Sequence, residues 1–85
     1  MTEYNVLITR PARKDLESFP AKTQDRILGA IEDLRKNPRP RGCKKLQGRE
    51  NAYRIRVGIY RVIYEIHGKD LLVLVVRIRH RKGAY

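Results

Sequence analysis

The chain has 85 residues, which is enough for one small domain with a single hydrophobic core, expected over residues 1–85. Lysine and arginine number 20 and aspartate and glutamate number 9, so the net charge is +11 and the isoelectric point is near 10.4. The sequence shows no apolar run long enough to span a bilayer and no signal peptide, so we expect a cytoplasmic protein. A single cysteine, Cys43, excludes an internal disulfide and a thiolate metal cluster.

Positive charge is concentrated in the second half of the chain. Residues 1–42 carry nine basic and six acidic residues, whereas residues 43–85 carry eleven basic and three acidic residues. Solubility alone requires no such asymmetry. The distribution favours a polyanionic partner, which could be a nucleic acid, an anionic membrane surface or an acidic protein.

A strand and two helices are predicted first. Residues 4–10 alternate as a strand does, and apolar side chains on both faces place this strand inside a sheet. Pro11 opens a short helix, and Pro20 separates it from a longer helix over residues 21–36. The apolar stripes of the two helices are Ala12, Leu16 and Phe19, and Ile27, Leu28, Ile31 and Leu34. The short connection predicts a helical hairpin.

A loop and three strands follow. Residues 37–51 are interrupted by proline and glycine and are rich in bases, which predicts a loop with Leu46 as its anchor. The strands are expected at 52–57, 60–67 and 71–80, joined as an antiparallel meander.

Alternation along these strands predicts two different sheet faces. The face against the helices is expected to hold Tyr53, Ile55, Val57, Tyr60, Val62, Tyr64, Ile66, Leu72, Leu74, Val76 and Ile78. The opposite face is expected to hold Arg54, Arg56, Arg61, Ile63, Val73, Val75, Arg77 and Arg79. The predicted fold is therefore α+β, with an N-terminal strand, an α-helical hairpin and a three-stranded antiparallel meander. Its helices cover one face of a four-stranded, mostly antiparallel sheet.

The uncovered face is predicted to be a shallow positive trough in which arginine predominates. A guanidinium binds phosphate through two parallel hydrogen bonds and stacks on bases, and both properties suit RNA.

Several stretches of the chain together resemble the RelE/ParE toxin superfamily, and most of all the RelE-type messenger-RNA interferases of bacterial toxin–antitoxin systems. They are the first strand with the helical hairpin, the KLQG sequence at 45–48, the sequence YRIRVGIYRVIY at 53–64, and the closing His80 and Arg81 with Tyr85. The resemblance covers almost the whole chain.

The resemblance implies a RelE-like microbial ribonuclease fold and a role in stress response. Such toxins inhibit translation by cleaving messenger RNA in the ribosomal A site, in contact with ribosomal RNA. The 2′-hydroxyl attacks the adjacent phosphate, and no metal or other cofactor takes part. A cognate RelB-like antitoxin with an acidic or amphipathic segment neutralises the toxin, operator DNA is bound only through the antitoxin, and no membrane partner is implied.

The resemblance also assigns roles to residues. The catalytic positions of the family correspond to Arg54, Arg56, Arg61, His80, Arg81 and Tyr85. Well-studied relatives have lysine where Arg54 and Arg56 stand, and a guanidinium keeps its proton, so these two are expected to hold phosphate rather than to act as a base. Proton transfer then falls to His80 or Tyr85, although strand alternation turns His80 away from the trough.

Further basic residues are expected to bind RNA without taking part in the chemistry: Lys44, Lys45, Arg49, Arg77, Arg79 and Lys82. The two histidines, His67 and His80, lie far apart and have no acids at ligand spacing, so no metal site is expected.

Two other functions fit the same sequence. The chain could be a ParE-like inhibitor of DNA gyrase, because that toxin shares the fold. It could also be a basic module that binds RNA or an antitoxin without catalysis, because lysine is absent from two catalytic positions and the chain ends at Tyr85.

Overall fold

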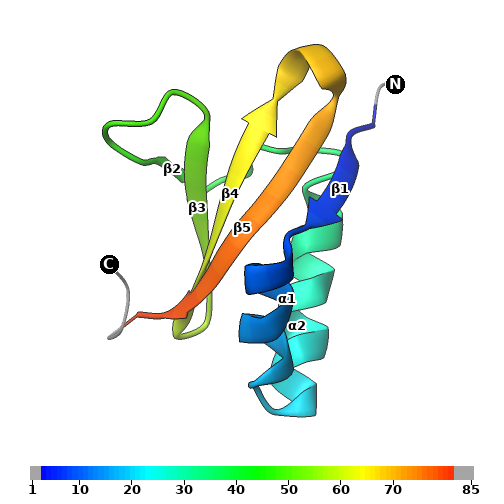
Figure 1. Cartoon of the computed structure of the whole chain (residues 1–85), viewed down its shortest axis with the longest axis vertical. Helices are drawn as coiled ribbons and strands as arrows, with labels where there is room; N and C mark the ends of the chain where they lie inside the picture. The colour runs from blue at the N-terminus through cyan, green and yellow to red at the C-terminus, as the bar shows by residue number, and fades with distance from the viewer. Residues whose placement is uncertain (1–2, 82–85) are drawn as a thin grey trace.

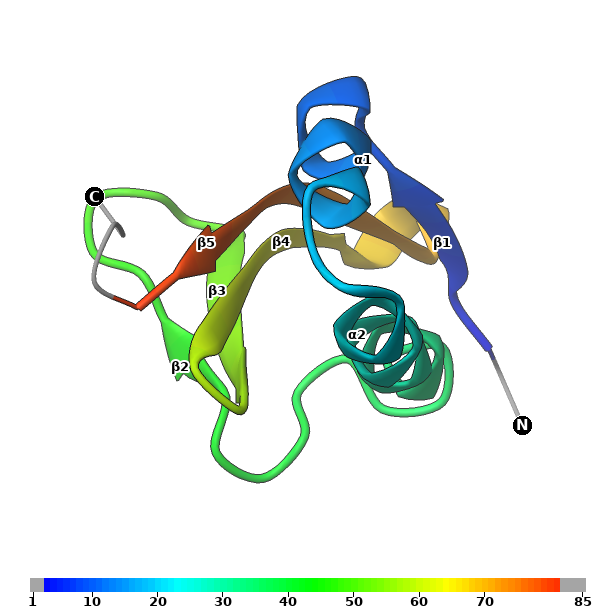
Figure 2. The same ribbon diagram turned by 90° about the horizontal axis from the view of Figure 1, so that it is seen from below.

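The computed structural model describes residues 3–81 and contains two helices and a five-stranded sheet. The elements are β1 (Asn5–Ile8), α1 (Arg10–Glu17), α2 (Ala21–Asp33), β2 (Lys44–Lys45), β3 (Ala52–Val57), β4 (Tyr60–His67), a 3-10 turn at Gly68–Asp70, and β5 (Leu72–His80). The strands lie in the order β1-β5-β4-β3-β2, with both helices beside the sheet (Figures 1 and 2). Neither helix of the described chain is long and apolar enough to cross a membrane.

The α+β class, the N-terminal strand, the helical hairpin and the antiparallel β3–β4–β5 meander are confirmed. The strand number is wrong, because the predicted loop 37–51 contains β2, a strand of two residues that is too short to show alternation. The sheet is mixed, since β1 pairs parallel to β5, and β1 lies at its edge rather than inside it. Leu7 of β1 is accordingly 57% exposed.

The core lies between the two helices and one face of the sheet. Helices α1 and α2 contribute Ala12, Leu16, Ile27, Ile31 and Leu34. The strands contribute Ile55, Val57, Val62, Tyr64, Ile66, Val73, Val75 and Ile78. Tyr64 is fully buried and donates a hydrogen bond of 2.7 Å from its hydroxyl to the carbonyl of Pro38. Burial raises the pKa of the Tyr64 hydroxyl, so the group stays a donor in this position.

Strand β5 contains a bulge that the sequence pattern did not reveal. Tyr64 pairs with Val75 and Ile63 pairs with Arg77, so Val76 is an extra residue on β5. One extra residue moves everything after it to the other face of the sheet.

The bulge divides β5 into two halves with opposite phase. In the first half Val73 and Val75 are fully buried in the core. The predicted facing of that half, with Leu72, Leu74 and Val76 in the core, is therefore wrong. In the second half Ile78 is buried, and Arg79 lies on the opposite face as predicted.

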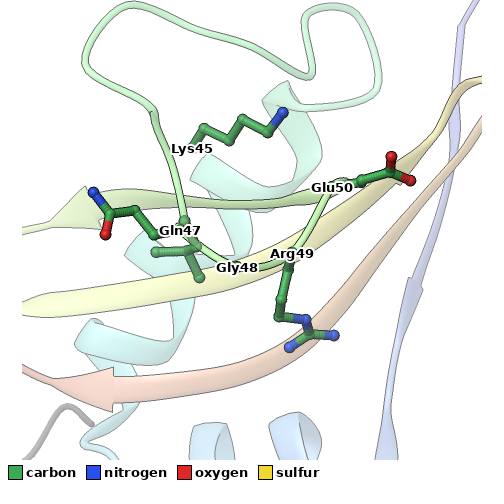
Figure 3. Close-up of a pocket in the computed structure, with 6 residues that line it drawn as sticks. Lys45, Gln47, Gly48, Arg49 and Glu50 are labelled. Atoms are coloured by element: carbon green, nitrogen blue, oxygen red, sulfur yellow. The ribbon is translucent and has the colours of Figure 1, made fainter.

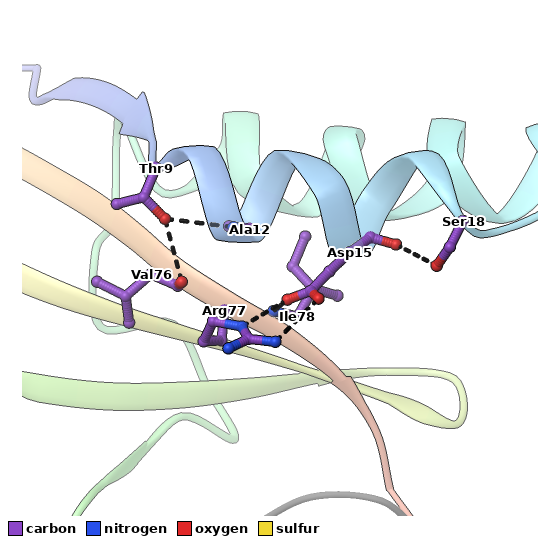
Figure 4. A network of polar contacts seen from close by, with 7 residues as sticks. All are labelled: Thr9, Ala12, Asp15, Ser18, Val76, Arg77 and Ile78. Carbon is purple, nitrogen blue, oxygen red and sulfur yellow. Dashed lines mark hydrogen bonds and ion pairs between the residues drawn. The ribbon is translucent and has the colours of Figure 1, made fainter.

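Helix α1 is fixed to β5 at this bulge by its first residues. Strand β1 stops pairing at Ile8, opposite Val75, so the rest of β5 has no strand on that side. The hydroxyl of Thr9 donates to the carbonyl of Val76 at 3.1 Å and accepts a hydrogen bond from the N–H of Ala12 at 3.3 Å. Thr9 thus caps α1 and satisfies the exposed edge with the same side chain (Figure 4).

Asp15, one turn further along α1, completes the attachment (Figure 4). Its carboxylate accepts two hydrogen bonds from the guanidinium of Arg77, at 2.9 and 3.1 Å, and one from the N–H of Ile78 at 3.0 Å. Burial alone raises the pKa of Asp15, but these hydrogen bonds and the charges of Arg77 and Arg79 outweigh it and lower the pKa below its ordinary value of 3.8. Helix, bulge and arginine are therefore joined by one ionised carboxylate.

We expect Asp15→Asn to lower the free energy of unfolding at pH 7 by about 1–2 kcal/mol, because Arg77 loses a charged, two-point acceptor. A lowered folded-state pKa gives stability that is present above the unfolded pKa near 3.8 and is lost as the pH falls through the folded pKa. The difference between the two proteins should therefore shrink below pH 3.8. Urea unfolding at pH 7 and pH 3 measures it, with the exposed Asp25→Asn as the matched control. A constant difference at both pH values would contradict this role of the Asp15 charge.

Candidate nucleic-acid interface

Three arginines lie side by side across β3, β4 and β5, one residue pair from the β3–β4 turn. Arg56 of β3 is opposite Arg61 of β4, and Arg61 is opposite Arg79 of β5. Their neighbours Val57, Val62 and Ile78 are in the core, so period-two alternation turns the arginines to the face away from the helices. We call Arg56, Arg61 and Arg79 the arginine row.

A second row of cross-strand neighbours lies two residues further along the strands. It joins Lys44 to Arg54, Arg54 to Ile63, and Ile63 to Arg77. The predicted grouping of Arg54, Arg56, Arg61, Arg77 and Arg79 on one sheet face is therefore found in the structure. Lys44 extends that face onto β2.

Much of the positive charge on this face is not offset by acids. Among residues 3–81, no acidic side chain forms an ion pair with Arg54, Arg56 or Arg79. Glu65 lies on the same face of β4, but it is bound by Arg49 and lies 2.9 Å from Nε2 of His67. Directly opposed like charges destabilise a sheet, so this face gains most from a bound polyanion.

The loop between β2 and β3 covers one side of this face (Figure 3). It is closed by a hydrogen bond of 2.8 Å from the N–H of Leu46 to the carbonyl of Ala52. Gly48 reverses the chain at a φ of +82°, a conformation that other residues rarely adopt, and Arg49 then reaches Glu65. A hollow forms between loop and sheet, which we call the loop hollow. Its lining residues are Leu46, Gln47, Arg49, Ile63, Val76, Arg77 and Arg79.

Other predicted RNA-binding and catalytic residues are more scattered. Lys45 is exposed, and its position opposite Tyr53 places it on the other side of β2 from Lys44. Arg81 follows β5, where its N–H donates to the carbonyl of Ile59 at 2.8 Å and so lies beside the β3–β4 turn. Lys82 and Tyr85 lie outside the described residues.

His80 is not brought to the arginine row. It pairs with Tyr60 across β4 and β5, and the two rings meet edge to face with their centroids 5.6 Å apart. The Tyr60 ring in turn lies 4.4 Å from the ring of Phe19, in the connection between the helices. His80 therefore lies on the helix side of the sheet, as strand alternation predicted.

Sequence reasoning did not identify Asp15 or Gln47 as residues of this region. Asp15 is one of several charged residues on a short helix, and its role depends on the bulge, for which the sequence has no clear signal. Gln47 could have been noticed, because it is a neutral donor and acceptor in an otherwise basic loop. Within residues 3–81, no cluster of three or more His, Cys, Asp or Glu side chains could hold a metal ion.

The chain is similar to known proteins over nearly its full length. A family model described as the ParE toxin of the type II toxin–antitoxin system parDE matches residues 6–85. The chain is 34% identical over 86 residues to the putative toxin RelE1 of Methanocaldococcus jannaschii, covering 98% of this chain and 96% of that protein. It is 36% identical over 84 residues to toxin RelE3 of the same organism, covering 94% and 93%.

Solved structures give the same picture. The archaeal RelE–RelB complex from Pyrococcus horikoshii matches with a TM-score of 0.84 at 35% identity, covering 99% of this chain and 100% of that one. The RelBE2 complex of Mycobacterium tuberculosis matches with a TM-score of 0.81 at 32% identity, covering 93% and 99%. The isolated RelE toxin of E. coli, at 18% identity and a TM-score of 0.81, shares the fold, with 95% and 87% covered.

We expect Arg56→Gln to stabilise the free protein, because it removes one of the three opposed charges of the arginine row. The gain should be about 0.2–1 kcal/mol in low salt and should fall in about 1 M salt, where surface charges are screened. Urea unfolding at the two salt concentrations measures it. The control is Arg13→Gln, an exposed arginine on α1. An Arg56→Gln protein less stable than the Arg13→Gln protein in low salt would contradict the repulsion argued for the row.

Proposed function

Since this chain belongs to the ParE toxin family of type II toxin–antitoxin systems and its relatives at 34–36% identity are RelE toxins, we propose that it cleaves messenger RNA. The cleavage takes place in the ribosomal A site in the cytoplasm, and a cognate antitoxin suppresses it. One domain, residues 1–85, carries the activity.

The arginine row is the observation that carries this proposal. Three guanidiniums side by side on a rigid sheet bind the phosphates of a single RNA strand, and sheet register fixes their spacing. Arg54 and Lys44 extend the contact along the strand, and Arg81 adds a charge at the β3–β4 turn. An idle solvent-facing surface would mix acids with these bases.

The chemistry proposed is transfer of the phosphoryl group to the neighbouring 2′-oxygen. The bond from the 2′-oxygen to phosphorus forms and the bond to the 5′-oxygen breaks, which leaves a 2′,3′-cyclic phosphate and a 5′-hydroxyl. Negative charge accumulates on the non-bridging oxygens in the transition state, and Arg61, flanked by Arg56 and Arg79, stabilises that charge. The step needs one group to accept the proton of the 2′-hydroxyl and one to protonate the leaving oxygen.

The arginines cannot supply the base, because a guanidinium stays protonated. His80 and Tyr85 were the two candidates from the sequence. The packing of His80 against Tyr60, on the helix side of the sheet, favours Tyr85 for proton transfer.

The antitoxin is proposed to bind the same sheet face. The apolar part of this face includes Leu7, which is 57% exposed on edge strand β1 and pairs with the half-buried Leu74 of β5. An amphipathic antitoxin segment would cover these leucines and place acidic side chains on the arginine row. The relatives from Pyrococcus horikoshii and Mycobacterium tuberculosis are toxins solved in complex with their antitoxins.

Inhibition of DNA gyrase is a second candidate, favoured by the description of the matching family model as a ParE toxin. The fold does not separate the two activities. A supercoiling assay with purified gyrase does, because a gyrase inhibitor blocks supercoiling and leaves ribosome-bound message intact.

Primer-extension mapping of translated messages after induction tests the proposal. The wild-type protein should produce new 5′ ends within codons. Arg61→Ala should lower the cleavage rate by about 100-fold or more, because a donor to the transition-state charge is lost. Tyr85→Phe should lower it by about 100-fold, and His80→Ala by no more than a few fold.

The variants also define the outcomes that oppose the proposal. Arg13→Ala on the helix side serves as the charge-matched control and should cleave like the wild type. If messages stay intact and supercoiling by gyrase is inhibited, the protein is a gyrase inhibitor and not a nuclease. If Arg61→Ala cleaves at the wild-type rate, the arginine row is not part of the active site. If only His80→Ala loses most of its cleavage rate, His80 and not Tyr85 transfers the proton.

The antitoxin surface is tested by Leu7→Asp. A charge in place of an exposed leucine that faces an acidic partner should weaken antitoxin binding by about tenfold or more. Leu28→Asp, at a 39% exposed leucine on α2, is the control and should bind as the wild type does. Calorimetric titration with the antitoxin encoded beside the toxin gives the dissociation constant of each variant. Equal affinities for the two variants would exclude β1 from the interface.

A further inference from the structure

The loop hollow has an apolar floor next to the arginine row. Ile63 is only 7% exposed, although it lies on the sheet face away from the helices. Val76, the bulge residue, and Leu46 of the covering loop are both partly buried and line the same hollow. These side chains form an apolar floor, and the cross-strand neighbours of Ile63 on this face are Arg54 and Arg77.

Two of the arginines at the rim of the hollow, Arg49 and Arg77, differ from those of the arginine row in one respect. The charge of Arg49 is offset by Glu65, and that of Arg77 by the two hydrogen bonds to Asp15. These contacts orient both guanidiniums, and a guanidinium plane can stack on a base. Two of the three arginines that line the hollow are therefore offset by acids, whereas Arg56 and Arg79 in the adjoining row form no ion pair within residues 3–81.

We propose that the loop hollow binds a nucleobase of the RNA whose phosphate lies on the arginine row. The inference rests on the proposed ribonuclease function and extends it to base recognition. A phosphate would find two of the rim charges already neutralised and would leave the apolar floor unused. A purely apolar group would cover the Gln47 amide without giving it a hydrogen-bond partner, at a cost. A nucleobase matches the site because it combines flat apolar faces with a polar edge.

The geometry gives each side chain a part in this recognition. Arg79 belongs both to the arginine row and to the lining of the hollow, so one nucleotide can span the two. Successive rows on the sheet are two residues apart, about 6.6 Å, which is of the order of the reach from a phosphate to its own base. Gln47 lies on the loop beside Gly48 (Figure 3) and lines the hollow, so its amide can offer one donor group and one acceptor to the edge of the base.

Binding of short RNA without ribosomes tests the inference directly. The probe is a fluorescein-labelled 2′-O-methyl trinucleotide, which lacks the attacking hydroxyl, and its partner is the same molecule without bases. Wild-type protein should bind the intact probe about tenfold more tightly than the abasic one, because stacking and edge contacts are lost in the latter. Gln47→Ala should reduce that ratio at least threefold and leave affinity for the abasic probe unchanged.

Two matched variants separate the base from the phosphate. Arg56→Ala should weaken both probes equally, because it removes a phosphate contact only. Asn51→Ala, an exposed amide in the same loop that does not line the hollow, should behave as the wild type. Shifts of the Ile63 and Val76 methyl resonances with the intact probe, but not with the abasic one, would place the base in the hollow. Thermal unfolding of each variant shows that the fold is retained.

The inference is overturned if the wild type binds both probes equally or if Gln47→Ala leaves their ratio unchanged. It is also overturned if Gln47→Ala alters antitoxin binding alone, because the hollow would then serve the protein partner. The assay does not depend on cleavage. A protein that binds bases in the hollow and cuts no message would retain this site and lose the proposed nuclease function.

Discussion

The structure depends on one carboxylate, Asp15, at the single irregular point of strand β5. Continued alternation from Val73 and Val75 would turn Arg77 and Arg79 into the core, where an unpaired charge is very costly. The bulge at Val76 moves them to the outer face instead. Asp15 fixes that bulge, because it accepts from the backbone after the bulge and from the first arginine that the bulge turns outward.

Two acidic residues, Asp15 and Glu65, determine which arginines of the sheet are paired with a negative charge. Asp15 and Glu65 form their ion pairs with Arg77 and Arg49 beside the β2–β3 loop, and neither forms one with Arg56 or Arg79 of the arginine row. A protein with 20 bases and 9 acids could have spread its acids evenly. Their actual placement creates a cationic strip next to a hollow in which Arg49 and Arg77 are already offset, and this contrast separates phosphate from base in the proposed mode of RNA binding.

The helices, the β3–β4–β5 meander and the helix side of β3 and β4 could all be predicted, because each depends on local periodicity. The parallel pairing of β1 could not, because apolar residues on both faces, Leu7 included, do not distinguish an edge strand from an inner one. The prediction of which β5 residues face the core was wrong for a different reason. Six of its residues are apolar, so alternation fits either phase, and only the tertiary contacts of Thr9 and Asp15 select the bulge. The arginine row was nonetheless predicted, since its members lie on the far side of that bulge.

An arginine row of this kind couples inhibition to activity without a conformational switch. The positions of Arg56, Arg61 and Arg79 are fixed by hydrogen-bonded register, so a partner cannot easily move them. Their repulsion is relieved by any well-placed polyanion, and RNA and an acidic antitoxin segment satisfy the same requirement. For the proposed function, the two ligands must then exclude one another by occupying the same charges. In the proposed mode of inhibition, Leu7 and Leu74 would give the antitoxin an apolar contact beyond the arginine row, and this contact would let it displace the message although both ligands bind the same row.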